Sequence, residues 1–238
     1  MTSKRDWEIV RDPAGDDERL FFDEAEWQLL HAATARIIPT DHDPGAREAN
    51  VVRFIDRYLS GIGYIYASAD GSGFLRLEGK EADAWQTRVT ALQDRYREGL
   101  RTLDQLSHDM FKAPFTELDA DRQDDVLVAL SGWPKPENVD ITPMVEGSPE
   151  RPGAGGAPPS NQPIPDDELE FFPMLVLHAR QGFYSDPVYG GNRDHVGWQV
   201  IGFPGPKSLT LTQTGQYSTL EYMLPDAEWP YAATDSGS

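Results

Sequence analysis

Two aspartates on either side of a glycine turn are the residues whose types and spacing could carry acid–base chemistry. Asp186 precedes Pro187, and Asp194 follows Arg193, with a Gly-Gly pair between them. In a hydrolase such a pair acts as acid and base only when the carboxyl groups lie at a suitable separation, which the sequence does not show. A simpler interpretation is structural: Asp186 bonds its own turn backbone, and Asp194 caps the following short helix. Arg193 can pair with either.

The sequence does not contain a recognisable pattern of metal ligands. The chain has no cysteine, so thiolate metal sites, disulfides and cysteine nucleophiles are excluded. Asp119, Asp121 and Asp124 lack the glycine and the closing glutamate of a calcium loop, and fit better at a helix N-terminus. The histidines form no HExxH motif. We therefore expect no metal site. We interpret the five histidines as ordinary core or surface residues: His31, His42, His108, His178 and His195.

Sequence motifs that bind nucleotides or activate a serine are also missing. Gly153–Pro158 has proline where the dinucleotide fingerprint needs its third glycine, and no predicted strand precedes it. There is no Gly-Lys-Ser or Gly-Lys-Thr phosphate loop and no Gly-x-Ser-x-Gly turn. We expect this chain to bind no cofactor and to have no catalytic residue.

The stretch Phe183–Gly205 concentrates aromatic residues, glycines and prolines after an apolar, helix-like segment. Gly190-Gly191-Asn192 predicts a tight turn, because these residues tolerate positive φ. Pro187 favours an extended conformation at Asp186. Aromatic rings on such rigid turns suit a surface that binds something. The alternative is a helix connection whose rings complete the core.

Two blocks of sequence between residues 20 and 205 carry a family resemblance. The C-terminal block reads Phe-Tyr-Ser-Asp-Pro-Val-Tyr-Gly-Gly-Asn at 183–192, Val-Gly-Trp at 196–198 and Ile-Gly-Phe-Pro-Gly at 201–205. The N-terminal block reads Phe-Phe-Asp-Glu-Ala-Glu at 21–26, Ile-Ile-Pro-Thr-Asp at 37–41, Pro-Gly-Ala-Arg-Glu-Ala at 44–49 and Val-Arg-Phe-Ile-Asp at 52–56. In this order the blocks resemble the gluconate 2-dehydrogenase subunit 3 family, the small subunits of FAD-dependent sugar or polyol dehydrogenases.

The resemblance implies a function in support of another chain. Small subunits of this type are non-catalytic and bind a large flavoprotein subunit, of the GMC type, that holds FAD and performs the chemistry. We therefore expect this chain to bind, stabilise and help mature such a subunit in a hetero-oligomer, in which a cytochrome subunit is a further candidate partner. Two alternatives remain open: a transient assembly chaperone for the flavoprotein, and an independent enzyme that acts on a small polar substrate.

We expect the residues that bind the partner to lie in the C-terminal block. An obligate interface places aromatic anchors at its centre, so the aromatic side chains are the expected anchors and Arg193 is the expected polar clamp. The predicted partner-binding residues are Tyr184, Asp186, Tyr189, Asn192, Arg193, Trp198 and Phe203.

The net charge limits the classes of partner. The 238 residues include 40 acidic and 21 basic side chains, which gives a net charge of −19. Nucleic acid and anionic membranes would repel this charge, so neither is an expected partner. No apolar stretch has the length of a membrane span, and residues 1–19 show no twin-arginine or secretory signal. We expect a cytoplasmic protein; the alternative is a periplasmic location after export with the partner.

The periodicity of apolar residues predicts an all-α fold, an irregular helical bundle. Asp23 is the expected cap of a first helix that ends at Pro39. Glu81 to Leu106 carries the longest apolar stripe. Further helices are expected at 46–59, 119–130, 167–183 and 194–201. Within 167–183, Pro173 marks either the start of the helix or a bend in it.

Other segments depart from the helical pattern. Tyr64–Tyr66 and Phe74–Leu77 flank a glycine turn and predict a small β-hairpin. The prolines and glycines of 133–165 predict a flexible insertion. We therefore expect an irregular arm at 1–20, one helical domain at 21–206 that contains this insertion, and a C-terminal extension at 207–238 that wraps either its own domain or a partner.

Overall fold

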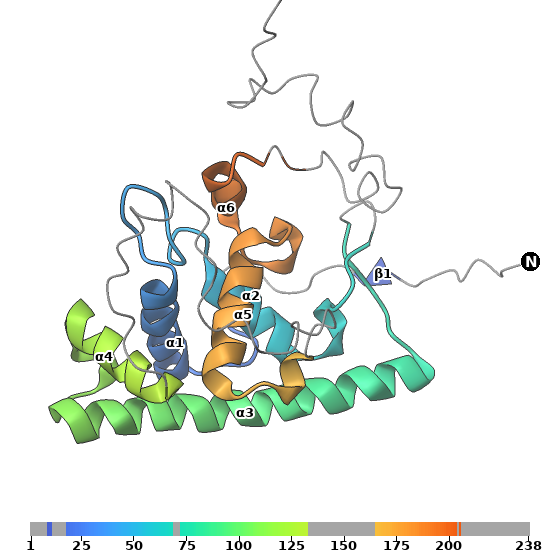
Figure 1. Cartoon of the computed structure of the whole chain (residues 1–238). Helices are drawn as coiled ribbons and strands as arrows, with labels where there is room; N and C mark the ends of the chain where they lie inside the picture. Colours follow the sequence, from blue (N-terminus) through green and yellow to red (C-terminus); the bar gives the residue numbers. More distant parts are fainter. Residues whose placement is uncertain (1–8, 11–17, 69–71, 133–164, 204, 206–238) are drawn as a thin grey trace, which may run out of the picture.

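Six α-helices make up most of the described structure (Figure 1). The computed structural model describes residues 9–10, 18–68, 72–132, 165–203 and 205. The long helix α3 runs along the base, α1, α2 and α5 stand across it, and α4 packs beside α1 and α3 at one end. This arrangement confirms the predicted all-α fold. The helices are α1 (Glu24–Ile37), α2 (Val51–Ser60), α3 (Gly79–Phe111), α4 (Ala120–Ser131), α5 (Phe171–Tyr184) and α6 (Val196–Val200).

Helix α1 begins at the predicted cap. Asp23 Oδ1 accepts a hydrogen bond from Glu26 N–H (2.8 Å), and Glu26 Oε2 accepts one from Asp23 N–H (3.1 Å). This reciprocal capping box satisfies amide groups that have no partner within the helix. The helix ends at Ile37, shortly before Pro39, as the sequence predicts.

Helix α2 starts later than the sequence predicts. It begins at Val51 instead of Ala46, because Asn50 has a positive φ of 53° that interrupts the helical conformation. The preceding turns lie against the end of α1, where a Cβ on Gly45 would lie 2.5 Å from the Ile38 carbonyl oxygen. This close approach requires glycine, so the packing of the turns on α1 overrides the local helix preference.

Helix α3 provides the surface on which the other helices pack. It extends beyond the predicted range of 81–106 at both ends and stops at Lys112, which has a positive φ of 61°. A Cβ on Gly99 would lie 2.0 Å from the ring of Phe171, so this glycine lets α5 approach α3 closely. The predicted apolar stripe is buried through Val89, Leu92, Tyr96, Leu100 and Leu103.

Helices α4 and α5 begin where the local sequence favours a helix start. Asp119 Oδ1 accepts a hydrogen bond from Arg122 N–H (3.0 Å). This bond confirms the prediction that Asp119, Asp121 and Asp124 mark the N-terminal part of a helix. Helix α5 begins at Phe171, later than the predicted Asp167, and Pro173 lies in its first turn. A missing N–H costs no helical hydrogen bond there, so the proline marks the start and not a bend.

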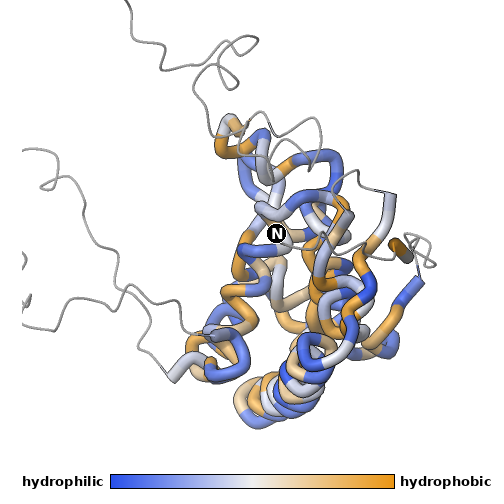
Figure 2. The backbone as a smooth tube through the Cα atoms, turned by 90° about the vertical axis from the view of Figure 1, so that its right-hand side faces the viewer, coloured by the Kyte–Doolittle hydropathy of each residue, from blue (hydrophilic) through white to orange (hydrophobic). Residues whose placement is uncertain are grey.

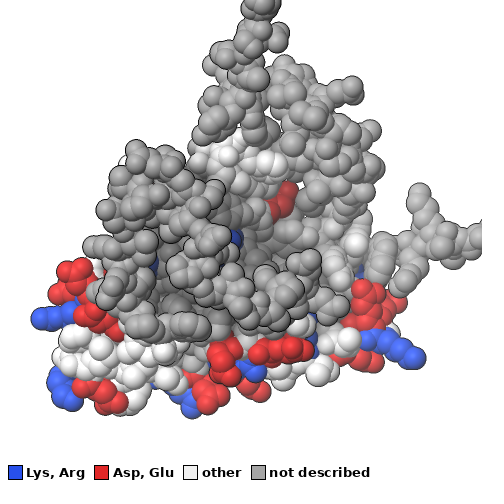
Figure 3. All heavy atoms as spheres, viewed as in Figure 1, with Lys and Arg blue, Asp and Glu red and all other residues white. Residues whose placement is uncertain are grey.

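The helices pack around a shared core, and α2 is buried on nearly all sides, including its charged residues. In Figure 2 hydrophobic and hydrophilic residues alternate along the helices, as expected for helices that bury one side. On the face shown in Figure 3, acidic side chains gather along the lower edge, where α3 lies, with basic ones among them. Fully buried side chains at the centre of the core include Leu30, Ile55, Leu92, Leu103, Met174 and Leu175.

A short antiparallel element lies beside the helices. Strand β1 (Ile9–Val10) pairs with β2 (Phe74–Leu75), and Ala67 forms a bridge with Phe74. The two sides of the predicted hairpin therefore meet, since Leu75 N–H also donates to the Tyr66 carbonyl oxygen (2.8 Å). Strand β1 was not expected, because it comes from the predicted irregular arm.

Parts of the predicted domain organisation lie outside the described residues. These are the insertion at 133–165, apart from Pro165, and the extension at 207–238. The division of the chain into arm, helical domain and extension stays a prediction.

Candidate partner-binding site

The segment 185–205, here called the motif loop, is held in place by its own turns. Ser185 N–H donates to a carbonyl oxygen in the last turn of α5 (2.8 Å) and ends that helix. Asp186 Oδ1 then accepts a hydrogen bond from Val188 N–H (3.0 Å) and starts the 3-10 turn η5 (Pro187–Tyr189). Asp186 is therefore a turn residue that bonds its own backbone, as predicted.

Two glycines bring the motif loop into backbone contact with α5. A Cβ on Gly191 would lie 2.1 Å from the carbonyl oxygen of Gly182, and one on Gly197 would lie 1.9 Å from that of Phe183. Non-bonded atoms do not approach this closely, so only glycine fits at either position. The Gly-Gly-Asn turn thus packs against a helix and does not form an open cradle for a phosphate.

Asn192 is the buried centre of the motif loop. Its Nδ2 donates to the carbonyl oxygen of Ser185 (2.8 Å), and its Oδ1 accepts a hydrogen bond from Gly197 N–H (2.9 Å). The residue is fully buried and has a positive φ of 46°, which asparagine tolerates better than most residues. Its amide therefore ties the two ends of the turn together.

Trp198 fixes the last part of the motif loop. Its Nε1 donates to the carbonyl oxygen of Tyr184 (2.7 Å), and its ring packs edge-on against Phe203 with centroids 5.3 Å apart. A Cβ on Gly205 would lie 2.4 Å from the indole ring, so the chain crosses directly over it. The indole thereby joins the end of α5 to the residues that follow α6.

The predicted cap of the last helix is wrong. Helix α6 starts at Val196 and is preceded by the 3-10 turn η6 (Arg193–His195). Asp194 lies inside this turn with a positive φ of 54°, and His195 takes the N-cap position without a capping side-chain bond. The turn precedes the close contact of Gly197 with α5, a tertiary contact that the local sequence does not reveal.

The seven predicted partner-binding residues divide into an inner, an intermediate and an outer group. Asn192 and Trp198 are buried and shape the loop, whereas Tyr184 (42% exposed) and Arg193 are exposed. Arg193 makes no ion pair within the described residues, although the sequence suggested Asp186 or Asp194 as its partner. A role in partner binding stays a prediction for all seven. The intermediate group is Asp186, Tyr189 and Phe203.

Two buried arginines of α2 support the motif loop and the start of the domain. Arg57 Nη1 donates to the carbonyl oxygen of Val188 (3.1 Å). Arg53 donates to the carbonyl oxygen of Glu18 and lies 3.4 Å from Asp56 Oδ2. Both residues are almost completely buried, and a guanidinium in such a place requires polar partners.

Asp56 binds the segment that leads into α1. Its fully buried carboxylate accepts hydrogen bonds from the backbone N–H groups of Leu20 (2.8 Å), Phe21 (2.9 Å) and Phe22 (3.0 Å). Charge-assisted bonds of this kind are stronger than neutral ones. They hold the start of α1 against α2, the helix whose Arg57 bonds the motif loop.

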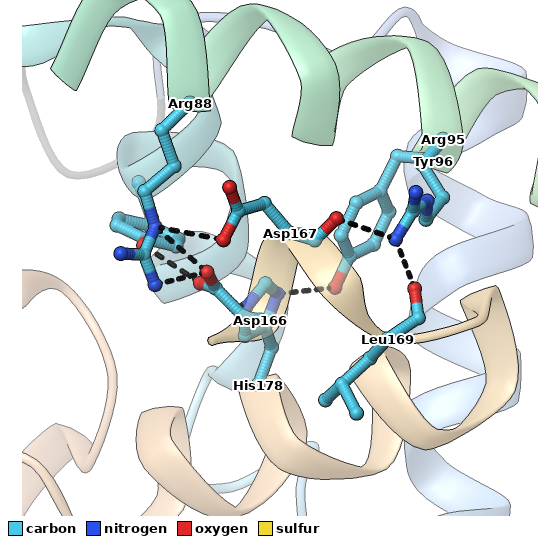
Figure 4. Close-up of polar contacts among 8 residues, drawn as sticks. Arg88, Arg95, Tyr96, Asp166, Asp167, Leu169 and His178 are labelled. Atoms are coloured by element: carbon cyan, nitrogen blue, oxygen red, sulfur yellow. Dashed lines mark hydrogen bonds and ion pairs between the residues drawn. The ribbon is translucent and has the colours of Figure 1, made fainter. Parts of the chain in front are cut away.

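A second buried network joins α2, α3 and α5, and Figure 4 shows His178 between Asp166 and Tyr96. Asp166, in the turn before α5, accepts hydrogen bonds from Tyr58 O–H on α2 and from Arg88 Nε on α3, both at 2.8 Å. His178 Nε2 on α5 lies 3.0 Å from the same carboxylate, and its Nδ1 lies 2.9 Å from the Tyr96 hydroxyl. One carboxylate therefore contacts side chains from three helices.

Burial and hydrogen bonding set the protonation of Asp166, Tyr58 and Tyr96 at neutral pH. Burial alone would raise the pKa of Asp166, but hydrogen bonds from His178, Tyr58 and Arg88 lower it well below its usual range. Burial, followed by the nearby Asp166 carboxylate, raises the pKa of Tyr58, and complete burial raises that of Tyr96. Asp166 is thus ionised and both tyrosines are protonated. So acidic a carboxylate is a poor proton acceptor, which suits a structural role.

The sequence pattern does not single out these buried polar residues. His178 lies in the apolar run of α5, where an isolated histidine is ordinarily interpreted as an unremarkable core or surface residue. A usable signal exists on α2, because Arg53, Asp56 and Arg57 lie among residues that the apolar pattern places in the core. Charges at core positions are expected only when they are paired.

A pocket of about 280 Å³ lies between the motif loop, α2 and the 3-10 turn η1 (Ile62–Tyr64). Its walls are mainly aromatic, and none of its lining side chains carries a formal charge. Ser185 Oγ is buried and makes no hydrogen bond within the described residues. Tyr58 connects this pocket to the Asp166 network, because its ring lines the pocket while its hydroxyl bonds the carboxylate. The lining residues are Phe54, Tyr58, Tyr64, Ile65, Gln181, Ser185 and Tyr189.

One group in the described residues has the spacing of metal ligands: Asp41, His42 and Asp43. His42 Nδ1 lies 3.2 Å from an Asp41 carboxylate oxygen, and its Nε2 lies 3.0 Å from one of Asp43. Both ring nitrogens of this exposed histidine therefore already face carboxylates.

Across the described ranges, no helix is both long enough and apolar enough to cross a membrane.

Comparison with known proteins identifies the family. No curated protein and no solved structure matched this chain. A family model described as gluconate 2-dehydrogenase subunit 3 matches residues 24–205, which run from the start of α1 to the end of the motif loop. This span is well over half of the chain and includes nearly all of both sequence blocks. The chain therefore belongs to the gluconate 2-dehydrogenase subunit 3 family.

Proposed function

We propose that this chain is a non-catalytic small subunit that binds, stabilises and helps to mature the large FAD-containing subunit, of the GMC type, of a sugar or alcohol dehydrogenase. Family membership supports the coarser part of this proposal, because the family is described as a subunit of a dehydrogenase. In the proposal FAD and the chemistry belong to the partner in a cytoplasmic complex, to which a cytochrome subunit is a candidate addition. This chain supplies no cofactor and no catalytic residue.

The observation that carries the proposal is the exposure of large hydrophobic side chains at the ends of α5 and α6. Six large hydrophobic side chains are exposed in the described residues, and three of them are Tyr184, Val200 and Ile201. Trp198 ties these elements together through its bond to Tyr184 (2.7 Å). Exposed apolar groups that gather in one place mark interaction surfaces. Arg193, from the same loop, adds an exposed positive charge in a chain whose net charge is −19.

The hydrogen bonds inside the motif loop support a structural role for its polar side chains. Asp186 Oδ1 is bound by Val188 N–H, and the amide of Asn192 is used on both sides within the loop. Gly191 lies against α5 at a separation that leaves no room for a phosphate. These groups build and position the outer surface, and the proposal assigns them no step in catalysis.

Co-production with the large flavoprotein subunit tests the proposal. We expect a tagged form of this chain to retain the flavoprotein through affinity purification and gel filtration, and the complex to be yellow. Binding that ends once the flavoprotein has acquired FAD would support the chaperone alternative. Oxidation of a sugar or alcohol by the isolated chain would contradict the proposal.

Two exposed tyrosines provide a matched pair of variants. Tyr184 and Tyr66 are 42% and 39% exposed, but only Tyr184 lies on the proposed surface. Tyr184→Ala should weaken binding to the large subunit by at least about 10-fold, as expected for an aromatic anchor. Tyr66→Ala should change it by less than about 2-fold. Equal effects of the two substitutions would count against this surface.

A further inference from the structure

A row of apolar side chains crosses one face of the small β-sheet. On one side of β2, Ile9 is the pairing partner of Leu75. On the other side Tyr66 stands opposite Leu75, whose N–H donates to the Tyr66 carbonyl oxygen (2.8 Å). Residues directly opposite in antiparallel strands point to the same face of a sheet. Ile9, Leu75 and Tyr66 therefore form one row, here called the sheet row.

The two faces of this sheet have opposite environments. On the inner face Phe74 and Ala67 are buried. Tyr189 of the motif loop covers them, because its ring packs against Phe74 with centroids 6.0 Å apart and its hydroxyl accepts a hydrogen bond from Ala67 N–H (3.2 Å). On the outer face Tyr66 is 39% exposed and Ile9 is 45% exposed. Large apolar side chains that are exposed together mark a surface suited to contact with another segment.

An aromatic contact extends the sheet row onto α3. The ring of Tyr66 meets that of Trp85 edge-on, with centroids 6.0 Å apart. The guanidinium of Arg88 lies 5.1 Å from the Trp85 ring centroid, but its charge is already paired with Asp166. The row and Trp85 thus offer aliphatic and aromatic groups, which favour an uncharged, partly apolar occupant.

The segment that follows the motif loop has the matching composition. Residues 208–220 contain no charged side chain, although the chain has a net charge of −19. Leu209 and Leu211 alternate with Thr210 and Thr212, the pattern of a strand that buries one side. In an extended conformation both leucines point to the same face.

The motif loop brings this segment close to the sheet. Its last described residue, Gly205, lies against the indole of Trp198, and the same loop already contacts the inner face of the sheet through Tyr189. In Figure 1 both α6 and the sheet lie above α3. Six residues lead from Gly205 to Leu211, and an extended chain of that length spans up to about 20 Å.

We propose that residues 208–212 pack across the outer face of the sheet, with Leu209 and Leu211 on the sheet row. The C-terminal extension then covers an apolar surface of its own domain. The exposed side chains at the ends of α5 and α6 stay open for a partner. The proposal goes beyond the proposed function and concerns contacts within this chain alone.

Pairs of introduced cysteines test the contact, because the chain has no cysteine of its own. Leu211→Cys is combined with Tyr66→Cys in one full-length variant and with Tyr184→Cys in the matched control. Tyr184 is similarly exposed, and its carbonyl oxygen bonds Trp198, on which Gly205 lies. An extension without a docking site would therefore meet position 184 at least as often as position 66.

We expect a short bis-maleimide to link positions 66 and 211 within one chain at least about 10-fold faster than positions 184 and 211, because docking raises their effective concentration. Equal rates, or faster linking to position 184, would overturn the proposal. Links between two chains in place of links within one would also overturn it, since they would assign the sheet row to a second copy.

Thiol accessibility tests which side of the extension faces the sheet. Leu211→Lys should speed maleimide labelling of the Tyr66→Cys variant by at least about 5-fold, because it opens the docked state. Thr210→Lys is the matched control and should change the rate by less than about 2-fold, because its side chain points away from the sheet. Equal acceleration by the two substitutions would contradict the proposed face.

Binding to the large subunit separates this proposal from the proposed function. We expect Leu211→Lys to leave that affinity within about 2-fold of wild type, since Leu211 faces its own domain. A loss of at least about 10-fold would assign the extension to the partner interface and overturn the proposal. Failure of the wild-type chain to bind the large subunit would refute the proposed function alone, because both cysteine experiments use this chain by itself.

Discussion

Asp166→Asn removes the charge on which the network of α2, α3 and α5 depends. The wild-type carboxylate accepts hydrogen bonds from Tyr58, Arg88 and His178. Hydrogen bonds to a charged group contribute about 1.5–3 kcal/mol each, roughly twice the value for neutral pairs. Asparagine can keep neutral bonds to Tyr58 and His178, but it leaves Arg88 with only the more distant Asp167 carboxylate (3.7 Å) as a counter-charge. We expect a loss of about 2–4 kcal/mol of unfolding free energy.

Urea denaturation followed by circular dichroism measures this loss at neutral pH. Asp167→Asn is the matched control, because its side chain is 34% exposed and its carboxylate lies 3.7 Å from Arg88 Nε. An ion pair of this kind contributes little, so the control should change by less than about 1 kcal/mol. A loss below about 0.5 kcal/mol for Asp166→Asn, within the range of ordinary surface substitutions, would refute the reasoning.

The pH dependence of stability provides a second readout of the same charge. The folded state lowers the pKa of Asp166 below its ordinary value of 3.8. Its contribution to stability is therefore fully present above that value and is lost as the pH falls through it towards the lower folded pKa. Between about pH 5 and pH 3 the wild type should lose more stability than Asp166→Asn. Identical slopes for the two proteins would contradict this assignment.

Three further predictions concern the motif loop. Asn192→Ala should lower the unfolding free energy by about 2–3 kcal/mol, because it deletes buried bonds to Ser185 and Gly197; thermal denaturation measures this. Gly197→Ala should cost more than about 3 kcal/mol, since its Cβ would lie 1.9 Å from the Phe183 carbonyl oxygen; the same melts and the soluble yield measure it. Arg193→Ala should leave the stability within about 0.5 kcal/mol of wild type and weaken binding to the large subunit by about 10-fold in calorimetric titrations.

Each of these predictions has a control or a contrary outcome. A Cβ on Gly63 would meet no atom within 4 Å, and its φ is not in the left-handed region, so Gly63→Ala is the matched glycine control. Similar melting of Gly63→Ala and Gly197→Ala would show that the motif loop does not pack closely on α5. An unchanged melting temperature for Asn192→Ala would contradict its buried role, and an unchanged affinity for Arg193→Ala would remove it from the interface.

The helices that the sequence predicts well are those whose signals are local. Asp23 and Glu26 lie within one turn of each other, so their capping box can be recognised without knowing the fold. The apolar stripe of α3 follows the helical period in the same way. The start of α2 could not be predicted, because residues 46–50 contain good helix formers. The helix starts after Asn50, whose positive φ ends a set of turns that Gly45 packs against the end of α1, a tertiary contact.

The same distinction between local and long-range signals applies to the candidate site. The turn at Asp186 was predictable, since its partner Val188 is two residues away. The Asp166 network was not, because Tyr58 and Asp166 are 108 residues apart and neither position has a local signal for the other. The same limit applies to the aromatic pocket, because residues from α2, η1, α5 and the motif loop form it only after the helices have packed. Residue types in the sequence indicated a binding surface, and tertiary packing decides which of them face outward.

Gel filtration monitored by light scattering and by flavin absorbance tests the central claim most directly. We expect this chain alone to be colourless and unable to oxidise a sugar or alcohol. Mixed with the large flavoprotein subunit, it should elute in one peak that contains both chains, the FAD and the dehydrogenase activity. Elution of a fully active, FAD-loaded large subunit separately from this chain, or flavin absorbance in the peak of this chain alone, would contradict the account.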